Sequence, residues 1–218
     1  METNQNSKKI FTKADLLTGL LCLLGMVPGL VCYNRMPAQV PIHFNIHNQP
    51  DDYASKNFVI FVMPLLMILL HLICCGAENV SDSSKSNPKQ VKWLVRLIIP
   101  TITMVLECIT VMFVLEKLTD IGLICISMIG VLMILLGNYM PKTRPNLVFG
   151  IKLPWTVTNE EVWHKTHRLA GWLMVLGGII TIAVAFLNAY LVCIFVITIV
   201  IMIPIIYSYI ISKKVVSE

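Results

Sequence analysis

Residues 169–211 read LAGWLMVLGGIITIAVAFLNAYLVCIFVITIVIMIPIIYSYII, a run of 43 residues without a charged side chain. As one straight helix this run would be about 65 Å long, twice the roughly 30 Å of a bilayer's hydrocarbon core. The run must therefore fold back on itself. Asn188 is the residue near its middle that best suits a turn. We expect two antiparallel membrane spans, at about 169–187 and 190–211.

Four further apolar runs precede this one, and each approaches the roughly 20 residues that a membrane helix needs. The whole 218-residue chain is 56% hydrophobic and only 13% charged, against about 25% charged in soluble domains. The seven cysteines lie within or at the ends of apolar runs, and their odd number argues against a disulfide framework. The first run is too long for the apolar core of a cleaved signal peptide. We predict an all-α polytopic membrane protein forming a single membrane domain over residues 1–218, with its first spans at about 14–33, 58–76, 94–115 and 121–139.

Basic residues predict the orientation of the spans, because they collect in cytoplasmic connections. Of the 17 lysines and arginines, all but Arg35, Lys56 and Lys117 fall in segments that the six spans place on one side. We therefore predict an N-in/C-in topology. It divides the chain into a first pair of spans with an outer loop (14–76, loop 34–57), a cytoplasmic linker (77–93), and four spans with a cytoplasmic loop between helices 4 and 5 (94–218, loop 137–171).

The cytoplasmic loop reads GNYMPKTRPNLVFGIKLPWTVTNEEVWHKTHRLAG from Gly137 to Gly171. Its prolines stiffen the chain, so we expect it to fold over the helix ends. Thr158 and Glu161 fit a capping box, which predicts a helix that starts in the loop and continues as the fifth span. On that helix one face would carry Glu160, His164, His167, Arg168 and Gly171.

The chemistry of this loop has several interpretations. Its basic excess is explained by topology and attraction to anionic lipids, or by an acidic face on a cytoplasmic partner. Glu161 and His164 have the spacing of one arm of a carboxylate-bridged metal site, but no second arm is present. The sequence contains no nucleophile with its base and no phosphate-binding glycine loop. We predict no catalytic residues, no metal and no cofactor, and no direct contact with nucleic acid.

The outer loop, NRMPAQVPIHFNIHNQPDDYASKN, favours extended backbone around Pro37 and Pro41 and a turn at 48–51, with Asn48 in the left-handed conformation. His43 and Asn45 would hydrogen-bond the loop to itself. Two alternatives stay open for this loop. One is a contact surface for an extracellular ligand, and the other is a metal site formed by His43, His47, Asp51 and Asp52.

Glu107 lies near the middle of the third span, where an ionised carboxylate is costly and often functional. It would serve either as a proton or ligand relay, or as a protonated group hydrogen-bonded to another helix. Small residues also occur within the spans, at Gly25-x-x-x-Gly29 and at Gly177-Gly178. They allow close helix packing within the bundle.

Two motifs resemble a known family. Pro41-x-His43-Phe44-Asn45 followed by Pro50-Asp51 and Lys56 is similar to the domain of unknown function at the start of SdpI-type immunity proteins. Gly137 to Asn146, Gly150-Ile151, Pro154-Trp155-Thr156 and Trp163-x-x-Thr166-His167-Arg168-x-x-Gly171 resemble the SdpI signature.

This resemblance implies a bacterial plasma-membrane protein that protects its cell from a secreted peptide toxin of the sporulation-delaying type. It further implies signalling, in which the toxin-bound protein holds a small DNA-binding autorepressor at the membrane. The residues implied to bind a ligand or partner are, in the cytoplasmic loop, Asn138, Pro141, Lys142, Arg144, Asn146, Gly150, Trp155, Thr156, Trp163, Thr166, His167 and Arg168, and, in the outer loop, Pro41, His43, Asn45, Asp51 and Lys56.

Two other functions compete with this one. Glu107 in the membrane suits a proton-coupled transporter or exporter. Glu160, Glu161, His164 and His167 would suit a membrane-embedded, metal-dependent enzyme.

Overall fold

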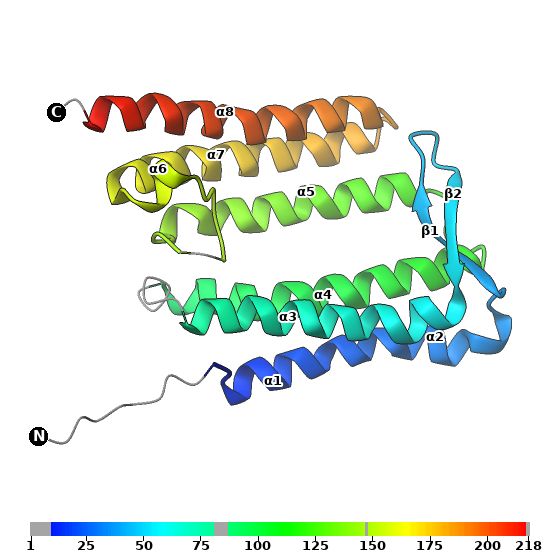
Figure 1. Cartoon of the computed structure of the whole chain (residues 1–218). Helices are drawn as coiled ribbons and strands as arrows, with labels where there is room; N and C mark the ends of the chain where they lie inside the picture. The colour runs from blue at the N-terminus through cyan, green and yellow to red at the C-terminus, as the bar shows by residue number, and fades with distance from the viewer. Residues whose placement is uncertain (1–9, 81–86, 147, 217–218) are drawn as a thin grey trace, which may run out of the picture.

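The computed structural model describes residues 10–80, 87–146 and 148–216 as a long helical bundle with a β-hairpin at one end (Figure 1). Within these residues, six helical stretches are long and apolar enough to cross a membrane. This confirms the predicted all-α membrane fold, to which the hairpin is a small addition. The stretches are Lys13–Arg35, Phe58–Val80, Lys89–Val114, Ile121–Lys142, Glu160–Ala185 and Tyr190–Val215.

The first stretch changes its winding three times. It consists of α1 (Lys13–Leu20), the tighter η1 (Leu21–Gly25), α2 (Met26–Cys32) and the final turn η2 (Tyr33–Arg35). Pro28 lacks a backbone N–H, so the carbonyl four residues before it loses its α-helical partner. This accounts for the tight winding of η1 just before α2.

The remaining helices are more regular. The second stretch joins η3 (Phe58–Val62), a single wide turn, to α3 (Met63–Val80), and it is followed by α4 (Lys89–Val114) and α5 (Ile121–Tyr139). The loop after α5 contains η5 (Met140–Lys142) and α6 (Pro154–Val157), and the chain ends with α7 (Glu160–Ala185) and α8 (Tyr190–Val216). Asn188, with a φ of 54°, makes the turn between α7 and α8, as predicted.

The helices form two groups of three spans. The stretch containing α1 and α2 packs with α3 and α4, while α5, α7 and α8 pack with one another. α4 and α5 follow each other in the chain but pack little together (Figure 1). The two groups are therefore connected mainly at the ends of the bundle.

Glycines bring α5 and α7 into close contact. A Cβ on Gly137 would lie 2.8 Å from the carbonyl oxygen of Gly171, and one on Gly178 would lie 2.5 Å from the carbonyl oxygen of Gly130. Both pairs need glycine because each backbone occupies the space of the other's side chain. Gly177 packs against the side chain of Val200 in α8. The expected role of glycines in packing within the bundle is confirmed.

The predicted outer loop, residues 34–57, contains an antiparallel hairpin of β1 (Gln39–Phe44) and β2 (Pro50–Ser55), with Asn48 in the turn at a φ of 61°. Asn48 thus has the predicted left-handed conformation. The strand pairing is irregular between Pro41 and Phe44, where proline removes a ladder donor. The base of the hairpin rests on an apolar cluster of Met36, Val40, Val59, Ile60 and Val111.

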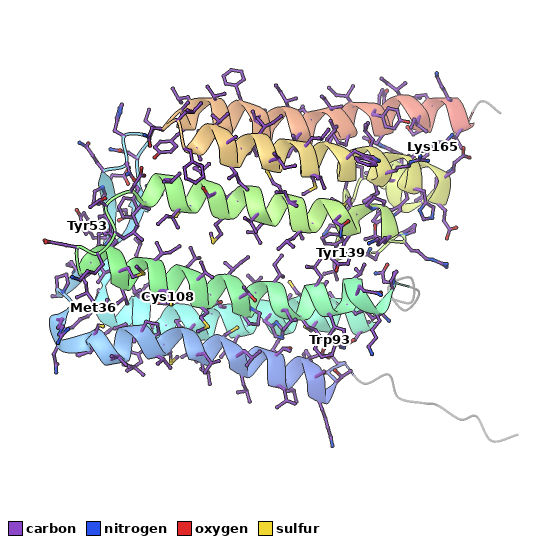
Figure 2. The ribbon with its side chains drawn as sticks, turned by 180° about the vertical axis from the view of Figure 1, so that it is seen from behind. Met36, Tyr53, Trp93, Cys108, Tyr139 and Lys165 are labelled. Carbon is purple, nitrogen blue, oxygen red and sulfur yellow. The ribbon has the colours of Figure 1, made fainter. Side chains whose placement is uncertain are left out.

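The hairpin and the loop that contains α6 lie at opposite ends of the bundle (Figure 1). Figure 2 shows the same separation: Met36 and Tyr53 mark one end, and Trp93, Tyr139 and Lys165 the other. In the predicted linker 77–93, residues 77–80 end α3 and 89–93 begin α4. Residues 81–86 of this linker lie outside the described part of the chain.

Candidate functional site

The loop between α5 and α7 is built around two side chains of α7. Trp163 and His167, one helical turn apart, stack with ring centroids 3.8 Å apart and an angle of 18° between the rings. Both residues have 0% of their surface exposed. The indole Nε1–H donates to the carbonyl oxygen of Thr143 at 3.1 Å. The pair therefore forms the interior of a folded loop.

The hydrogen bonds of His167 fix its tautomer. The backbone N–H of Ile151 donates to Nε2 at 2.9 Å, so Nε2 must carry a lone pair. Nδ1 lies 2.7 Å from the carbonyl oxygen of Trp163 and must therefore carry the proton. The imidazole is neutral and holds the loop to the helix at both nitrogens.

Gly150 covers this stacked pair. Its φ is 131°, in the region that side-chain-bearing residues rarely adopt. A Cβ at this position would run into Nε2 of His167 and lie within 3.0 Å of the Trp163 ring. Only glycine allows the chain to pass this close to the two rings.

Two polar side chains shape the loop on either side of Gly150. Asn146 accepts from the backbone N–H groups of Val148 and Phe149 at 2.9 and 2.7 Å, and so forms a tight turn. Thr156 accepts from the N–H of Leu153 at 2.9 Å and donates to the carbonyl oxygen of Ile151 at 2.7 Å. Both side chains are buried. They determine the loop's path rather than its surface.

Trp155 joins the loop to the last helix. Its Nε1–H donates to Ser208 Oγ of α8 at 3.0 Å, and its ring meets that of Tyr209 edge to face. The loop is thus attached to α7 through His167 and to α8 through Trp155. A displacement of either helix would be transmitted to it.

The helix start and the predicted face of α7 both need correction. The N-cap is Asn159 and not Thr158: its side chain accepts from the N–H groups of Glu161 and Val162, while the Thr158 hydroxyl donates to Pro154 O in the preceding helix. The predicted face is split. Glu160, His164 and Arg168 are exposed, whereas His167 and Gly171 are buried with Trp163 and Thr166.

The hydrogen bonds of His167 do not fit the alternative of a metal-dependent enzyme at this loop. His167 uses both nitrogens within the protein, so it is unavailable to join Glu160, Glu161 and His164. Among the residues that the structure describes, no group of three His, Cys, Asp or Glu side chains is placed to hold a metal ion.

Four other residues of the predicted site lie on the surface of the protein near the start of the loop. Asn138, Pro141, Lys142 and Arg144 are exposed. Pro141 packs on Gly171, and Lys142 lies over the ring of Tyr139 at 4.9 Å. The loop signature therefore separates into buried residues that hold the fold and exposed residues that are available to a partner.

The predicted outer residues mostly hold the hairpin together. His43 Nδ1 bonds to Asp51 at 2.5 Å across the strands. Asn45 accepts from the N–H groups of His47 and Gln49 in the turn. Lys56 donates to the carbonyl oxygen of Tyr33 at 3.0 Å and lies over the Tyr33 ring. The expected folded cap, bonded to itself through His43 and Asn45, is confirmed.

Asp120, which sequence reasoning missed, links the hairpin to the second helix group. Its Oδ1 accepts from Asn48 Nδ2 at 3.0 Å, from the N–H of Leu123 at 2.9 Å, and from the hydroxyl of Tyr190 at 2.8 Å. Asn48 Oδ1 in turn accepts from the N–H of Gly122 at 2.8 Å. One carboxylate thus joins the hairpin tip to α5 and α8. Its position before an apolar run was a visible N-cap signal.

At the opposite end, Asn87 joins the two groups. Its Oδ1 accepts from the N–H of Arg144 at 3.0 Å, and its Nδ2 donates to Glu78 at 3.3 Å. The segment before α4 is thereby fixed to the loop after α5. The two helix groups are bonded at the hairpin end through Asn48 and at the loop end through Asn87.

A second network missed from the sequence lies at the loop end of the first group. The buried carboxylate of Asp15 accepts from Arg96 Nε at 2.6 Å and from Asn79 Nδ2 at 2.7 Å. It also forms the capping box of α1 with Thr12. The buried carboxylate is thus paired with a half-buried guanidinium, and the network connects α1, α3 and α4.

Glu107 is buried in the first group, beside Gly25 and Thr103. Its Oε2 has no hydrogen-bond partner among the described residues. The predicted bond to another helix is therefore not formed by that oxygen.

Comparison with known proteins identifies two regions. The SdpI/YfhL protein family model matches residues 142–208, and the domain of unknown function DUF1648 matches residues 20–68. The immunity protein SdpI of Bacillus subtilis is 25% identical over 174 residues, covering 80% of this chain and 82% of that protein. The uncharacterized membrane protein YbgB of the same organism is 30% identical over 60 residues, which is 28% of this chain and 65% of that protein. No solved structure shows a significant match.

The matches cover the first motif noted in the sequence and the second from Lys142 onward. The DUF1648 match includes the hairpin, and the SdpI/YfhL match includes most of the loop, α7 and most of α8. Together with the six apolar helices, they make the chain a multi-pass plasma-membrane protein. The predicted resemblance is thus confirmed: the chain is similar to SdpI, with a match to DUF1648 followed by a match to the SdpI/YfhL family.

Proposed function

We propose that this protein is a bacterial immunity protein that protects its cell from a secreted peptide toxin. The observation that carries the proposal is the similarity to the immunity protein SdpI, which extends over 80% of this chain and 82% of the relative. The similarity therefore spans both ends of the bundle. The hairpin and the α6 loop lie at those two ends, as a protein with an outer ligand and an inner partner requires (Figure 1).

The hairpin faces the outside and the α6 loop the cytosol. This assignment rests on the positive-inside rule: 14 of the 17 lysines and arginines fall in the sequence segments that the six predicted spans assign to the side of the loop. Trp93 and Lys165 mark that end in Figure 2.

The toxin binds where the hairpin meets the second helix group. A cavity of about 310 Å³ lies there, lined mainly by apolar side chains of the hairpin, α5 and α8, including Ile42, Phe44, Ile126 and Ile194. An apolar peptide in the outer leaflet can reach such a surface directly. Asn48 and Tyr190 border the same cavity, so a bound peptide would press on the hydrogen bonds around Asp120.

The inner loop transmits the signal to a cytoplasmic partner, a small autorepressor. α5 and α8 both reach the loop, α5 through η5 and α8 through Trp155. The loop's exposed cations, Lys142 and Arg144, suit an acidic partner surface. The buried pair Trp163–His167 holds the loop that carries these cations in a fixed conformation.

The test is survival of a sensitive strain that expresses this protein and is exposed to a sporulation-delaying-type killing peptide. We expect the wild type to protect. Replacement of Ile126 by Asp in the cavity should abolish protection at unchanged membrane abundance, whereas Asp52→Asn, at an exposed hairpin position outside the cavity lining, should protect fully. Wild-type cells that die like cells without the gene would refute the proposal.

A second candidate is a proton-coupled transporter or exporter, favoured by one observation: Glu107 is buried in a span, and its Oε2 has no hydrogen-bond partner in the part of the chain that the structure describes. Such groups in membranes often carry protons. Glu107→Gln separates the two functions. It should leave protection intact in an immunity protein and should abolish substrate-dependent proton movement in liposomes if the protein is a transporter.

A further inference from the structure

A groove of about 420 Å³ lies between α5 and α7 at the loop end of the bundle. It is distinct from the cavity under the hairpin. It is lined by two residues of α5, four of α7 and one of η5: Gly137, Asn138, Arg168, Gly171, Trp172, Val175 and Pro141.

The glycines of the helix contact form the floor of this groove. Gly137 and Gly171 pack backbone to backbone, and the Pro141 ring lies against Gly171. A side chain at either glycine would both separate the helices and fill the space. The absence of side chains at Gly137 and Gly171 therefore allows both the close contact between α5 and α7 and the space of the groove.

The two polar side chains of the groove have no partner among the residues that the structure describes. Arg168 and Asn138 are exposed, and neither forms a hydrogen bond or ion pair with any residue in the described ranges. Lys165, one turn before Arg168, is by contrast paired with Glu161 at 2.6 Å. Arg168 thus offers a free guanidinium fork, the geometry that binds phosphate through two parallel hydrogen bonds.

The groove changes from polar to apolar along α7. Arg168 is followed one turn later by Trp172, which is 65% exposed, and then by Val175. The distance from Arg168 to Val175 along the helix axis is about 10 Å. An exposed indole beside an apolar stretch is typical of the membrane interface. Along the groove, Arg168, Trp172 and Val175 thus follow the order of the phosphate, glycerol and acyl regions of a lipid.

We propose that this groove binds one anionic glycerophospholipid. Arg168 and Asn138 hold the phosphate oxygens, and the beginning of an acyl chain lies over Trp172 and Val175. Lipid phosphates lie at the surface of both leaflets of a bilayer. The groove, at one end of the bundle, can therefore meet them in either orientation of the protein, provided that the helices span the membrane. A lipid held here would lie between α5 and α7 and against Pro141 of η5, and so bias the loop that follows η5.

Native mass spectrometry of the detergent-purified protein with added phosphatidylglycerol tests this. We expect the wild type to retain one lipid, and Arg168→Gln to retain it about tenfold more weakly, as the loss of charge-assisted hydrogen bonds predicts. Asn138→Asp, at an exposed site that tolerates the change, should weaken retention by repelling the phosphate. The matched control is Lys13→Gln, which removes an exposed cation at the same end of the bundle but outside the groove.

Unchanged retention in both Arg168→Gln and Asn138→Asp would overturn the proposal. Equal retention of phosphatidylcholine would refute selectivity for an anionic lipid. Displacement of the lipid by millimolar inorganic phosphate would show a small-anion site instead. Displacement by polyglutamate would show a surface for an acidic protein. Equal melting temperatures of the variants confirm that folding is not the cause.

Discussion

The indole of Trp163 lies on the imidazole of His167 at a centroid distance of 3.8 Å, and neither side chain has exposed surface. Both had the residue types of a binding site, and the resemblance to the SdpI signature implied that role for them. Their burial instead gives these two residues of the SdpI signature a structural role, because they hold the loop on α7. Without the stack, the loop that carries Lys142 and Arg144 would lose its attachment to α7.

His167→Ala should destabilise the protein by about 3 kcal/mol, because it removes a buried ring and leaves the Ile151 N–H without its acceptor. Thermal unfolding in detergent measures this change. His164→Ala, at an exposed position on the same helix, should change stability by no more than about 0.5 kcal/mol. Equal effects of the two substitutions would contradict the role assigned to His167.

Gly150→Ala should be destabilising for two reasons: a φ of 131° and a Cβ that meets His167 Nε2. We expect a loss of about 2–4 kcal/mol. The double variant Gly150→Ala/His167→Ala should lose less than the sum of the single losses, because the clash with the imidazole is gone. Strict additivity of the unfolding free energies would show that the two residues do not touch.

Hydropathy and charge predicted the parts of the fold that depend on local composition. Six spans follow from apolar length, and the conformations of Asn48 and Asn188 follow from the ability of asparagine to adopt the left-handed region. Thr158 and Asn159 were harder to separate, since both are good N-caps and only the preceding short helix decides between them.

Contacts between residues distant in the sequence could not be predicted in this way. Asn48 and Asp120 are 72 residues apart, and Asn87 and Arg144 are 57 apart. No local pattern pairs them. The hairpin was equally difficult, because Pro41 and Pro50 interrupt strand propensity and only the turn between them has a clear signature. The split face of α7 depends on which neighbours cover it, and helical spacing alone does not give that.

Asp120→Ala should release the hairpin tip, the start of α5 and Tyr190 together, since one oxygen accepts from all three. Hydrogen exchange should then accelerate in residues 39–55 and at the start of α8, while α3 keeps its protection. Lys117→Ala, at an exposed position in the same connection, serves as the control and should exchange like the wild type. Faster exchange confined to residues 121–123 would mean that Asp120 is only a helix cap.

The proposed orientation can be tested with an impermeant maleimide on intact cells. All seven native cysteines are buried or half-buried, so the unaltered chain should give a low background. Asp52→Cys lies at an exposed hairpin position and Lys152→Cys at an exposed loop position. With the positive end inside, the reagent should modify position 52 in intact cells and position 152 only after the membrane is opened. The reverse pattern would place the Trp163–His167 loop outside, where no cytoplasmic partner can reach it, and the signalling part of the proposal would fail.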